Sequence, residues 1–352
     1  MRRSLVVLTA AILLISTRAP LHADLLVYGL FSDYVDALRV RAGIPGLTAT
    51  IVGGLDILWE HPSGQQNIER SIAARADTPY QIDGLTQVTM ASVVLRCVED
   101  GYVSLDDTLG RFNPTNPEAG STIRQILSHT IGTPSNPVFA YYPERFNSLV
   151  DVVTVCTNGS FRTTVAAGLD RFAMFDSIPG LDVARMVPPV EGIANQTIDR
   201  YAAVLPRLAT PYAVDAQKHA TPSQYTSTTL TGSSGLITTA RDYAKFDLAL
   251  RNSVLLKPDT LAMAWRAPVD ASGAPLPHGL GWFVQTYNGE KIIWQFGVSD
   301  NASSSLVVTS PSRQLTLILL ANSDGLVKSF SLAAGDVTAS PFAKVFLGLF
   351  VQ

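Results

Sequence analysis

The chain has 352 residues, of which 47% are hydrophobic and 16% charged, with 26 Lys and Arg against 29 Asp and Glu. A chain of this length and apolar content buries a large core, which excludes a disordered protein and a small fold held mainly by disulfides. The few charges and their acidic balance provide no basic face for a phosphate backbone, so we expect no nucleic-acid partner.

The first 23 residues have the pattern of an export signal. Arg2 and Arg3 precede an apolar run over 5–15, and a small residue, Ala23, ends the segment. The run is too short to span a bilayer as a helix. Cleavage after Ala23 removes three arginines and no acid, which lowers the formal charge from −3 to −6. We therefore predict a periplasmic or secreted protein; the alternative is a hydrophobic first helix that stays in the fold.

Helical and strand patterns follow in a defined order. An apolar helical pattern covers 28–42, a two-strand hairpin covers 47–60, and a strongly apolar helix covers 86–100 before Gly101. Residues 121–213 are mainly helical in pattern. Strands then return, with Asn288-Gly289 as a hairpin turn, at 281–287, 291–296, 304–309 and 315–321.

Strands at both ends of the chain enclose this helical middle. We predict an α+β fold, an α/β sandwich whose antiparallel sheet is built from N- and C-terminal segments and flanked by helices, with an inserted all-helical lobe. The predicted bounds are 24–90 with 228–352 for the sheet-containing lobe and 91–227 for the mainly helical lobe. No later stretch has 18 consecutive apolar residues, so we predict no transmembrane segment in the mature chain. The apolar spacing over 341–352 predicts a terminal helix docked on the core.

The chain has two cysteines, Cys97 and Cys156. In an oxidising compartment they would be able to form a disulfide. Each also lies in an apolar helical stripe, where free cysteine packs as a small hydrophobic residue. The sequence leaves both alternatives open.

Several phrases, in this order along most of the mature chain, resemble the serine β-lactamase and penicillin-binding-protein superfamily. The branch is that of class C β-lactamases, D-alanyl-D-alanine peptidases and related esterases. The phrases begin at Gly101 (Gly-Tyr-Val-Ser-Leu-Asp-Asp), Ser121 (Ser-Thr-Ile-Arg-Gln-Ile-Leu-Ser-His-Thr), Gly235 (Gly-Leu-Ile-Thr-Thr-Ala-Arg-Asp), Gly279 (Gly-Leu-Gly-Trp) and Leu319 (Leu-Leu-Ala-Asn). The resemblance implies the fold predicted above.

The resemblance also implies a nucleophile, the serine of Ser-x-x-Lys at the start of a buried helix, with the lysine one turn later assisting proton transfer. In the family this serine lies 17 residues before the glycine that ends the helix and 21 before the following Leu-Asp. Counting back from Gly101 and from Leu105 gives residue 84 both times. Residue 84 is glycine, and residue 87, the lysine position, is glutamine. No Ser-x-x-Lys occurs anywhere in the sequence, because none of the six lysines has a serine three residues before it.

Two further elements of the family also depart from its pattern. The tyrosine of Tyr-x-Asn is matched by Tyr141, but Pro143 replaces the asparagine; a tyrosine that only packs in the core is the alternative. In the Lys/His-x-Gly element Gln295 replaces the cation, and Gly297 is kept. A glutamine at this place offers hydrogen bonds but no charge. We therefore predict a ligand-binding cleft around Gly84, Gln87, Tyr141, Gln295 and Gly297, and we assign no catalytic residue.

Other residues offer no clear substitute for the nucleophile. Thr86 is expected to face elsewhere on the helix, and Ser233-Ser234 lacks the spacing of a nucleophile elbow. The histidines of the mature chain have no metal-ligand spacing, so no metal or other cofactor is expected. His129 is interpreted as a packing residue, and His278 as an exposed loop residue or, alternatively, a group near the cleft.

Three hypotheses for function follow. The first is an exported non-catalytic member of this fold, a pseudoenzyme that binds a small-molecule or peptide-like ligand, ester-like or derived from the cell wall, between the lobes. The second is an active esterase, D-alanyl peptidase or weak β-lactamase with a non-standard nucleophile or an activated water. The third is a protein-interaction module, for which the sequence contains no dedicated motif.

Overall fold

The computed structural model describes residues 21–133 and 135–351. The predicted export signal lies outside these residues except for its last three, which begin the first helix. The helices are α1 (Leu21–Ala42), α2 (Thr86–Glu99), α3 (Ile123–Leu127), α4 (Val150–Thr157), α5 (Phe161–Arg171), α6 (Asn195–Val204), α7 (Ala240–Arg251), α8 (Pro258–Ala264) and α9 (Pro341–Phe350). Within the described part, no helix is both long and apolar enough to cross a membrane.

The main sheet joins the two ends of the chain, as predicted. Its strand order is β11-β12-β13-β14-β1-β2-β3, and every pair of neighbours is antiparallel. These strands are β1 (Gly46–Gly53), β2 (Asp56–Asn67), β3 (Ile72–Ala73), β11 (Phe283–Tyr287), β12 (Glu290–Ser299), β13 (Ser303–Ser310) and β14 (Leu315–Ala321). The predicted hairpins over 47–60 and around Asn288-Gly289 are confirmed, with longer strands.

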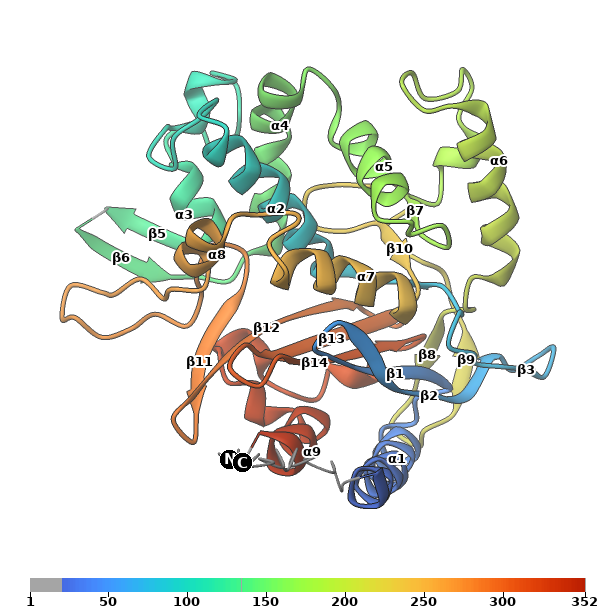
Figure 1. Ribbon diagram of the computed structural model, residues 1–352. Helices are drawn as coiled ribbons and strands as arrows, with labels where there is room; N and C mark the ends of the chain where they lie inside the picture. The colour runs from blue at the N-terminus through green and yellow to red at the C-terminus, as the bar shows by residue number, and fades with distance from the viewer. Residues whose placement is uncertain (1–20, 134, 352) are drawn as a thin grey trace, which may run out of the picture.

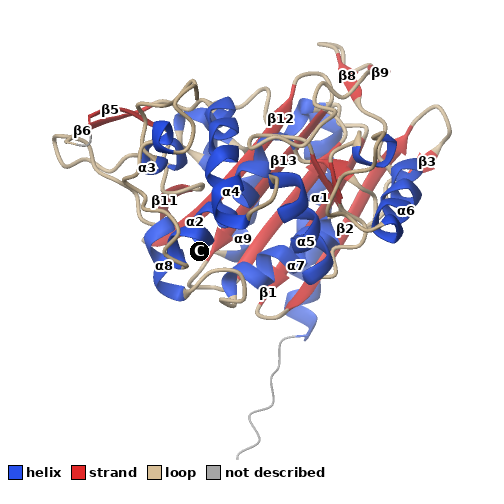
Figure 2. Cartoon of the chain, turned by 90° about the horizontal axis from the view of Figure 1, so that it is seen from above, coloured by secondary structure: helices blue, strands red, loops and turns tan. Residues whose placement is uncertain are grey.

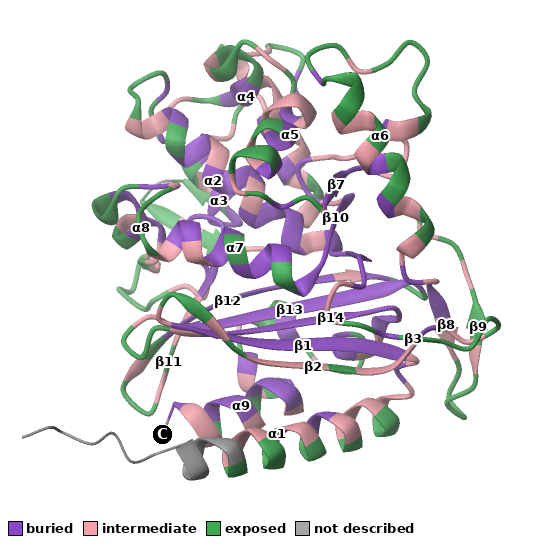
Figure 3. Ribbon diagram, turned by 45° about the vertical axis from the view of Figure 1, so that its right-hand side comes forward, coloured by how far each residue is buried: buried purple, intermediate pink, exposed green. Residues whose placement is uncertain are grey.

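Two layers of helices cover the sheet (Figure 1). Helices α1 and α9 lie together on one face, and α2, α7 and α8 lie on the other, with α4, α5 and α6 farther out. Every residue of β1 and β13 is buried, because both faces of the sheet are covered (Figure 3). Two apolar cores result, one on each face of the sheet. The predicted docking of the C-terminal helix on the core is therefore confirmed.

Short strands that the sequence patterns did not indicate lie within the helical middle and on either side of it. Seen from above, the β5–β6 hairpin projects from one end of the molecule and the β8–β9 pair lies near the other (Figure 2). These short strands are β4 (Tyr80–Gln81), β5 (Thr130–Thr133), β6 (Asn136–Phe139), β7 (Ile178–Pro179), β8 (Tyr212–Val214), β9 (Ala220–Pro222) and β10 (Leu236–Thr238).

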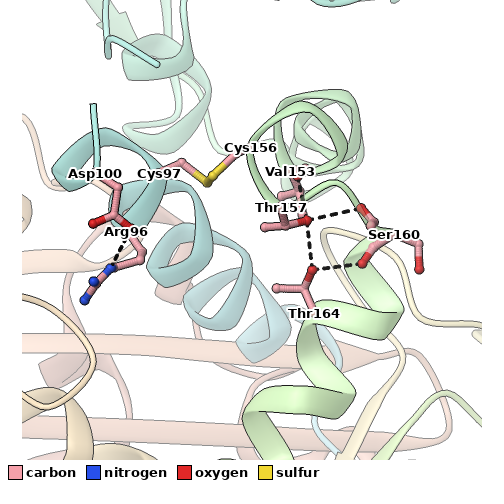
Figure 4. Close-up of a disulfide and its surroundings, with 9 residues drawn as sticks. Arg96, Cys97, Asp100, Val153, Cys156, Thr157, Ser160 and Thr164 are labelled. Carbon is pink, nitrogen blue, oxygen red and sulfur yellow. Dashed lines mark hydrogen bonds and ion pairs between the residues drawn. A yellow bond between two sulfur atoms is a disulfide. The ribbon is translucent and has the colours of Figure 1, made fainter. Parts of the chain in front are cut away.

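A disulfide links the helical layer. Cys97 on α2 and Cys156 on α4 form it, with a Cα–Cα distance of 5.9 Å (Figure 4). Cys97 is fully buried, whereas Cys156 is only partly buried against the same core. Of the two alternatives for the cysteines, the structure therefore has the disulfide.

Candidate functional site

A polar cleft lies beside the N-terminal end of α2. Its volume is about 540 Å³. The 3-10 helix η1 (Asp83–Leu85), the start of η3 (Pro143–Leu149), the loop before β10 and the end of β12 form its walls. The lining residues are Asp83, Gly84, Tyr141, Pro143, Glu144, Asn147, Thr226, Ser227, Thr231, Ser233, Ser234, Phe296, Gly297, Val298, Ser299 and Asp300.

Gly84 and Gly297 bring the tip of α2 and strand β12 into close contact. A Cβ atom on Gly297 would lie 2.1 Å from the carbonyl oxygen of Ile82 and 2.7 Å from the nitrogen of Gly84, so only glycine fits there. A Cβ on Gly84 would lie 3.1 Å from the carbonyl oxygen of Phe296. A side chain at residue 84 therefore needs only a small shift of its neighbours. The surrounding packing does not require a glycine there, in contrast to residue 297.

Gln87 lies one helical turn after Gly84 and is completely buried. Its Nε2 donates to the carbonyl oxygen of Gly84 at 2.9 Å and to the hydroxyl of Tyr141 at 3.3 Å. Its Oε1 lies 2.8 Å from Nε2 of His129. The backbone N–H of Tyr142 donates to Nδ1 of His129 at 3.3 Å, so a neutral His129 ring carries its proton on Nε2 and donates to Gln87. Both N–H groups of the amide and one of the two acceptor directions of Oε1 are thereby used.

The hydrogen bonds continue from Tyr141 toward β12. The Tyr141 hydroxyl donates to Oε1 of Gln295 at 3.4 Å, and Nε2 of Gln295 lies 3.4 Å from Nε2 of His278. Nδ1 of His278 lies 2.9 Å from the carbonyl oxygen of Gly279, which requires the proton on Nδ1 and leaves Nε2 to accept from Gln295. Residues 87, 129, 141, 295 and 278 therefore form one connected network behind the cleft.

Every titratable member of this network is held neutral. Burial lowers the pKa of His278 to about 3. Burial, together with the neighbouring His278 and Arg145, lowers the pKa of His129 well below its usual value. Burial also raises the pKa of Tyr141 above its usual value of 10. Neither imidazole is free to accept a proton near neutral pH, so the network supplies no general base.

The structure brings together all six family-equivalent residues that the sequence analysis named for this site. Gly84, Tyr141 and Gly297 line the cleft, and Gln87 and Gln295 lie directly behind Tyr141. The sixth, Pro143, also lines the cleft, on the wall formed by η3.

The structure also shows where two further residues of the sequence analysis, His278 and Thr86, lie. His278 is completely buried beside Gln295, so its interpretation as an exposed loop residue is wrong. The tight turn at Gly279 and Gly281 folds the loop back onto α3 and buries the ring. Thr86 is buried and accepts a hydrogen bond from Leu236, away from the cleft, as expected.

Sequence reasoning missed Asp83 and the hydroxyl-rich wall. The Asp83 side chain is 2% exposed, and its carboxylate accepts a hydrogen bond from Ser303 at 2.5 Å. Burial raises the pKa of Asp83 to about 7, and the bond from Ser303 opposes this shift. Ser227 and Ser234 lie 3.0 Å apart, with Thr231 also in reach. The only sequence signal for Asp83 is its position directly before residue 84.

No metal-binding arrangement is present in the described residues, because they contain no group of three His, Cys, Asp or Glu side chains placed to hold an ion. The cleft lining offers hydroxyl groups, backbone amides, the side-chain amide of Asn147 and three carboxyl groups, of which that of Asp83 is buried.

A comparison with protein families matches the Beta-lactamase family model over residues 31–159 and 179–338. Among curated proteins, penicillin-binding protein 4* of Bacillus subtilis is 28% identical over 87 residues. That match covers 25% of this chain and 19% of the relative, so the chain spans about a fifth of the relative's length.

Solved structures share the fold at low sequence identity. The octameric penicillin-binding protein homologue from Pyrococcus abyssi has a TM-score of 0.72 at 16% identity, over 91% of this chain and 77% of that chain. The D-amino acid amidase from Ochrobactrum anthropi complexed with L-phenylalanine has a TM-score of 0.69 at 16% identity, over 92% and 98%.

Proposed function

Because the chain belongs to the β-lactamase family, we propose that it is an exported member that binds a ligand in its cleft without forming a covalent intermediate. The observation that carries this proposal is the pair of positions at the tip of α2. Gly84 has no side-chain atom to attack a carbonyl group, and the neutral amide of Gln87 replaces the lysine. The surrounding framework of the family is kept, while the groups that perform the chemistry are changed.

The hydrogen-bond network also supports a loss of catalysis, in addition to the missing serine hydroxyl at residue 84. Gln87 is satisfied by its three partners, and both imidazoles near it are neutral. A lysine at this position would direct N–H groups at the N–H of His129, so the present packing favours glutamine. The interior around residue 87 therefore matches a glutamine rather than a lysine.

The cleft supports a role in binding. It is large enough for a small peptide-like or ester-like molecule, and its hydroxyl groups and backbone amides are suited to polar ligands. The amidase with the same fold was solved with L-phenylalanine, which supports an amino-acid-like ligand. We infer that the cleft lies between the two lobes, since its lining comes from the segments 24–90, 91–227 and 228–352.

Export is supported by two independent features. The first 23 residues have the composition of a signal peptide. The disulfide between Cys97 and Cys156 is a bond that persists in oxidising compartments such as the periplasm.

Labelling with a fluorescent penicillin and a fluorophosphonate tests the loss of covalent chemistry. We expect no labelling of the purified protein, with a competent class C β-lactamase as positive control. The variant Gly84→Ser with Gln87→Lys is the matched gain-of-function protein. Stoichiometric labelling of the unaltered chain would contradict the proposal.

A second candidate function, slow hydrolysis by an activated water, is favoured by Asp83. This carboxyl group lines the cleft beside Gly84, and its pKa of about 7 suits a general base. In that case the protein hydrolyses p-nitrophenyl esters, and the rate of hydrolysis rises with pH through about 7. The variant Asp83→Asn then loses this activity. The binding function predicts no turnover above that of Asp83→Asn.

A further inference from the structure

The charged residues of the cleft are all acidic. Asp83 lies at its floor, and Glu144 and Asp300 are exposed at its edge. The lining, which consists only of described residues, contains no lysine, arginine or histidine. Arg145, next to Glu144, bonds instead to Glu118, and Lys328 bonds to Asp324. Lys328 also interacts with Asp300 from outside the lining, whereas no cation acts on Asp83.

Asp83 is the unusual member of this set, because it is buried without a cation. Its Oδ2 accepts one hydrogen bond, from Ser303, and no other partner of its carboxylate occurs within residues 21–133 and 135–351. Two elements hold the group in place. The backbone of Asp83 has φ of +47°, a left-handed conformation that aspartate tolerates, and Ser303 stands at the first position of β13.

A buried carboxylate with a single neutral partner is unfavourable, and such groups are normally paired. The missing partner is supplied if the ligand itself brings a positive charge. An anionic ligand is disfavoured, because the neutral Gln295 offers it no positive charge and the acids of the cleft repel a carboxylate.

We propose that the cleft binds a primary ammonium group, with Asp83 as its counter-ion and the hydroxyl groups of Ser227, Ser234 and Thr231, which line the same cleft, as further acceptors. This proposal rests on the ligand-binding function proposed above and specifies its chemistry. The ligand class is a peptide-like molecule with a free amine rather than the free carboxylate of a D-alanyl terminus.

The protonation of Asp83 predicts how the affinity changes with pH. Because burial raises its pKa to about 7, Asp83 is largely protonated at pH 5.5 and largely ionised at pH 8. The neighbouring tyrosines Tyr80 and Tyr225 have raised pKa values and stay protonated over this range. The exposed acids are controlled with the variant Glu144→Gln with Asp300→Asn, which keeps Asp83.

Three probes of similar size separate charge from shape. They are Nα-acetyl-lysine amide, Nα-acetyl-norleucine amide and Nα-acetyl-glutamate amide, each as both enantiomers, with binding measured by ligand-observed NMR. The lysine side chain has a pKa of about 10.4 and stays charged throughout. We expect the lysine probe to bind about tenfold or more tightly than the norleucine probe at pH 8, as for a buried charge pair.

The variant Asp83→Asn keeps an acceptor for Ser303 and tolerates the left-handed backbone, so we expect it to fold. In this variant the preference for the lysine probe disappears, whereas Asp199→Asn, an exposed acid on α6, leaves it unchanged. If Asp83→Asn does not fold, the pH series on the unaltered chain decides, with affinity for the lysine probe rising from pH 5.5 to 8.

The two proposals fail in different ways. Equal binding of the lysine and norleucine probes, or tighter binding of the glutamate probe, overturns ammonium recognition and leaves the binding function intact. Binding of no probe by the folded protein counts against both.

Discussion

The strongest physical test of this structure is the effect of Asp83→Asn on stability at different pH values. In the folded protein the pKa of Asp83 is raised from 3.8 to about 7 because the group is buried without a cation. Below pH 3.8 the folded and unfolded states both hold the proton, and Asp83 costs nothing. Between the two values only the folded state holds it, so the free energy of unfolding falls as pH rises.

The size of this effect follows from the pKa shift. Each unit corresponds to about 1.4 kcal/mol, so at pH 8 the ionised Asp83 costs the folded state about 4 kcal/mol. At pH 5 the cost is about 2 kcal/mol by the same relation. The asparagine variant lacks this cost and keeps the hydrogen bond from Ser303. Its stability relative to the unaltered chain should therefore rise by about 2 to 3 kcal/mol between pH 5 and pH 8.

Urea denaturation followed by circular dichroism, at pH 5, 6, 7 and 8, measures the difference. Other titrating groups cancel, because both proteins carry them. The matched control is Asp242→Asn, since Asp242 is equally buried but accepts hydrogen bonds from Asp176, Ser177 and Lys245. That variant should lose stability. A difference for Asp83→Asn that does not change with pH would refute the description of Asp83 as a buried, unpaired acid.

Three further predictions test the surroundings of the cleft. Gln87→Leu removes all three hydrogen bonds of the amide and leaves the buried Nε2–H of His129 without a partner, which should lower the free energy of unfolding by about 2 kcal/mol in urea denaturation. Gly297→Ala places a Cβ against the backbone of Ile82, so the free energy of unfolding should fall by about 3 kcal/mol. The control is Gly168→Ala on α5, where the Cβ meets no atom within 4 Å and the change should be neutral or slightly stabilising. Equal losses of stability in the two variants would contradict the close packing of β12. Cys97→Ser with Cys156→Ser opens a loop of 59 residues, and the loop-entropy relation gives a loss of about 4 kcal/mol in the free energy of unfolding. This loss should appear as a lower Tm. An unchanged Tm would contradict a disulfide that constrains the unfolded chain.

The main elements of the fold could be predicted because their signals are local. The runs at 304–309 and 315–321 are rich in residues that favour strands, and both became central strands of the sheet. The apolar helix after residue 85 and its end at Gly101 were equally clear. The short strands β5 to β9 could not be predicted, because so few residues carry no measurable period.

The sequence by itself determined that the chain has no Ser-x-x-Lys, since the identity of a residue does not depend on its surroundings. It also determined the order of strands and helices that resembles the β-lactamase fold. Tertiary structure alone decided which groups surround the altered positions. Gln87 meets His129, 42 residues away, and Tyr141 meets Gln295, 154 residues away.

The protonation states of His278 and Asp83 were likewise decided by tertiary structure and not by the sequence. Neither histidine nor aspartate has a sequence pattern that fixes its protonation, because pKa values depend on burial and on neighbouring charges from distant segments. His278 became a buried, neutral acceptor through the turn at Gly279, and Asp83 became an unpaired acid only because β13 brings Ser303, but no cation, against it. Chemical identity was thus fixed along the chain, whereas charge and accessibility were fixed by packing.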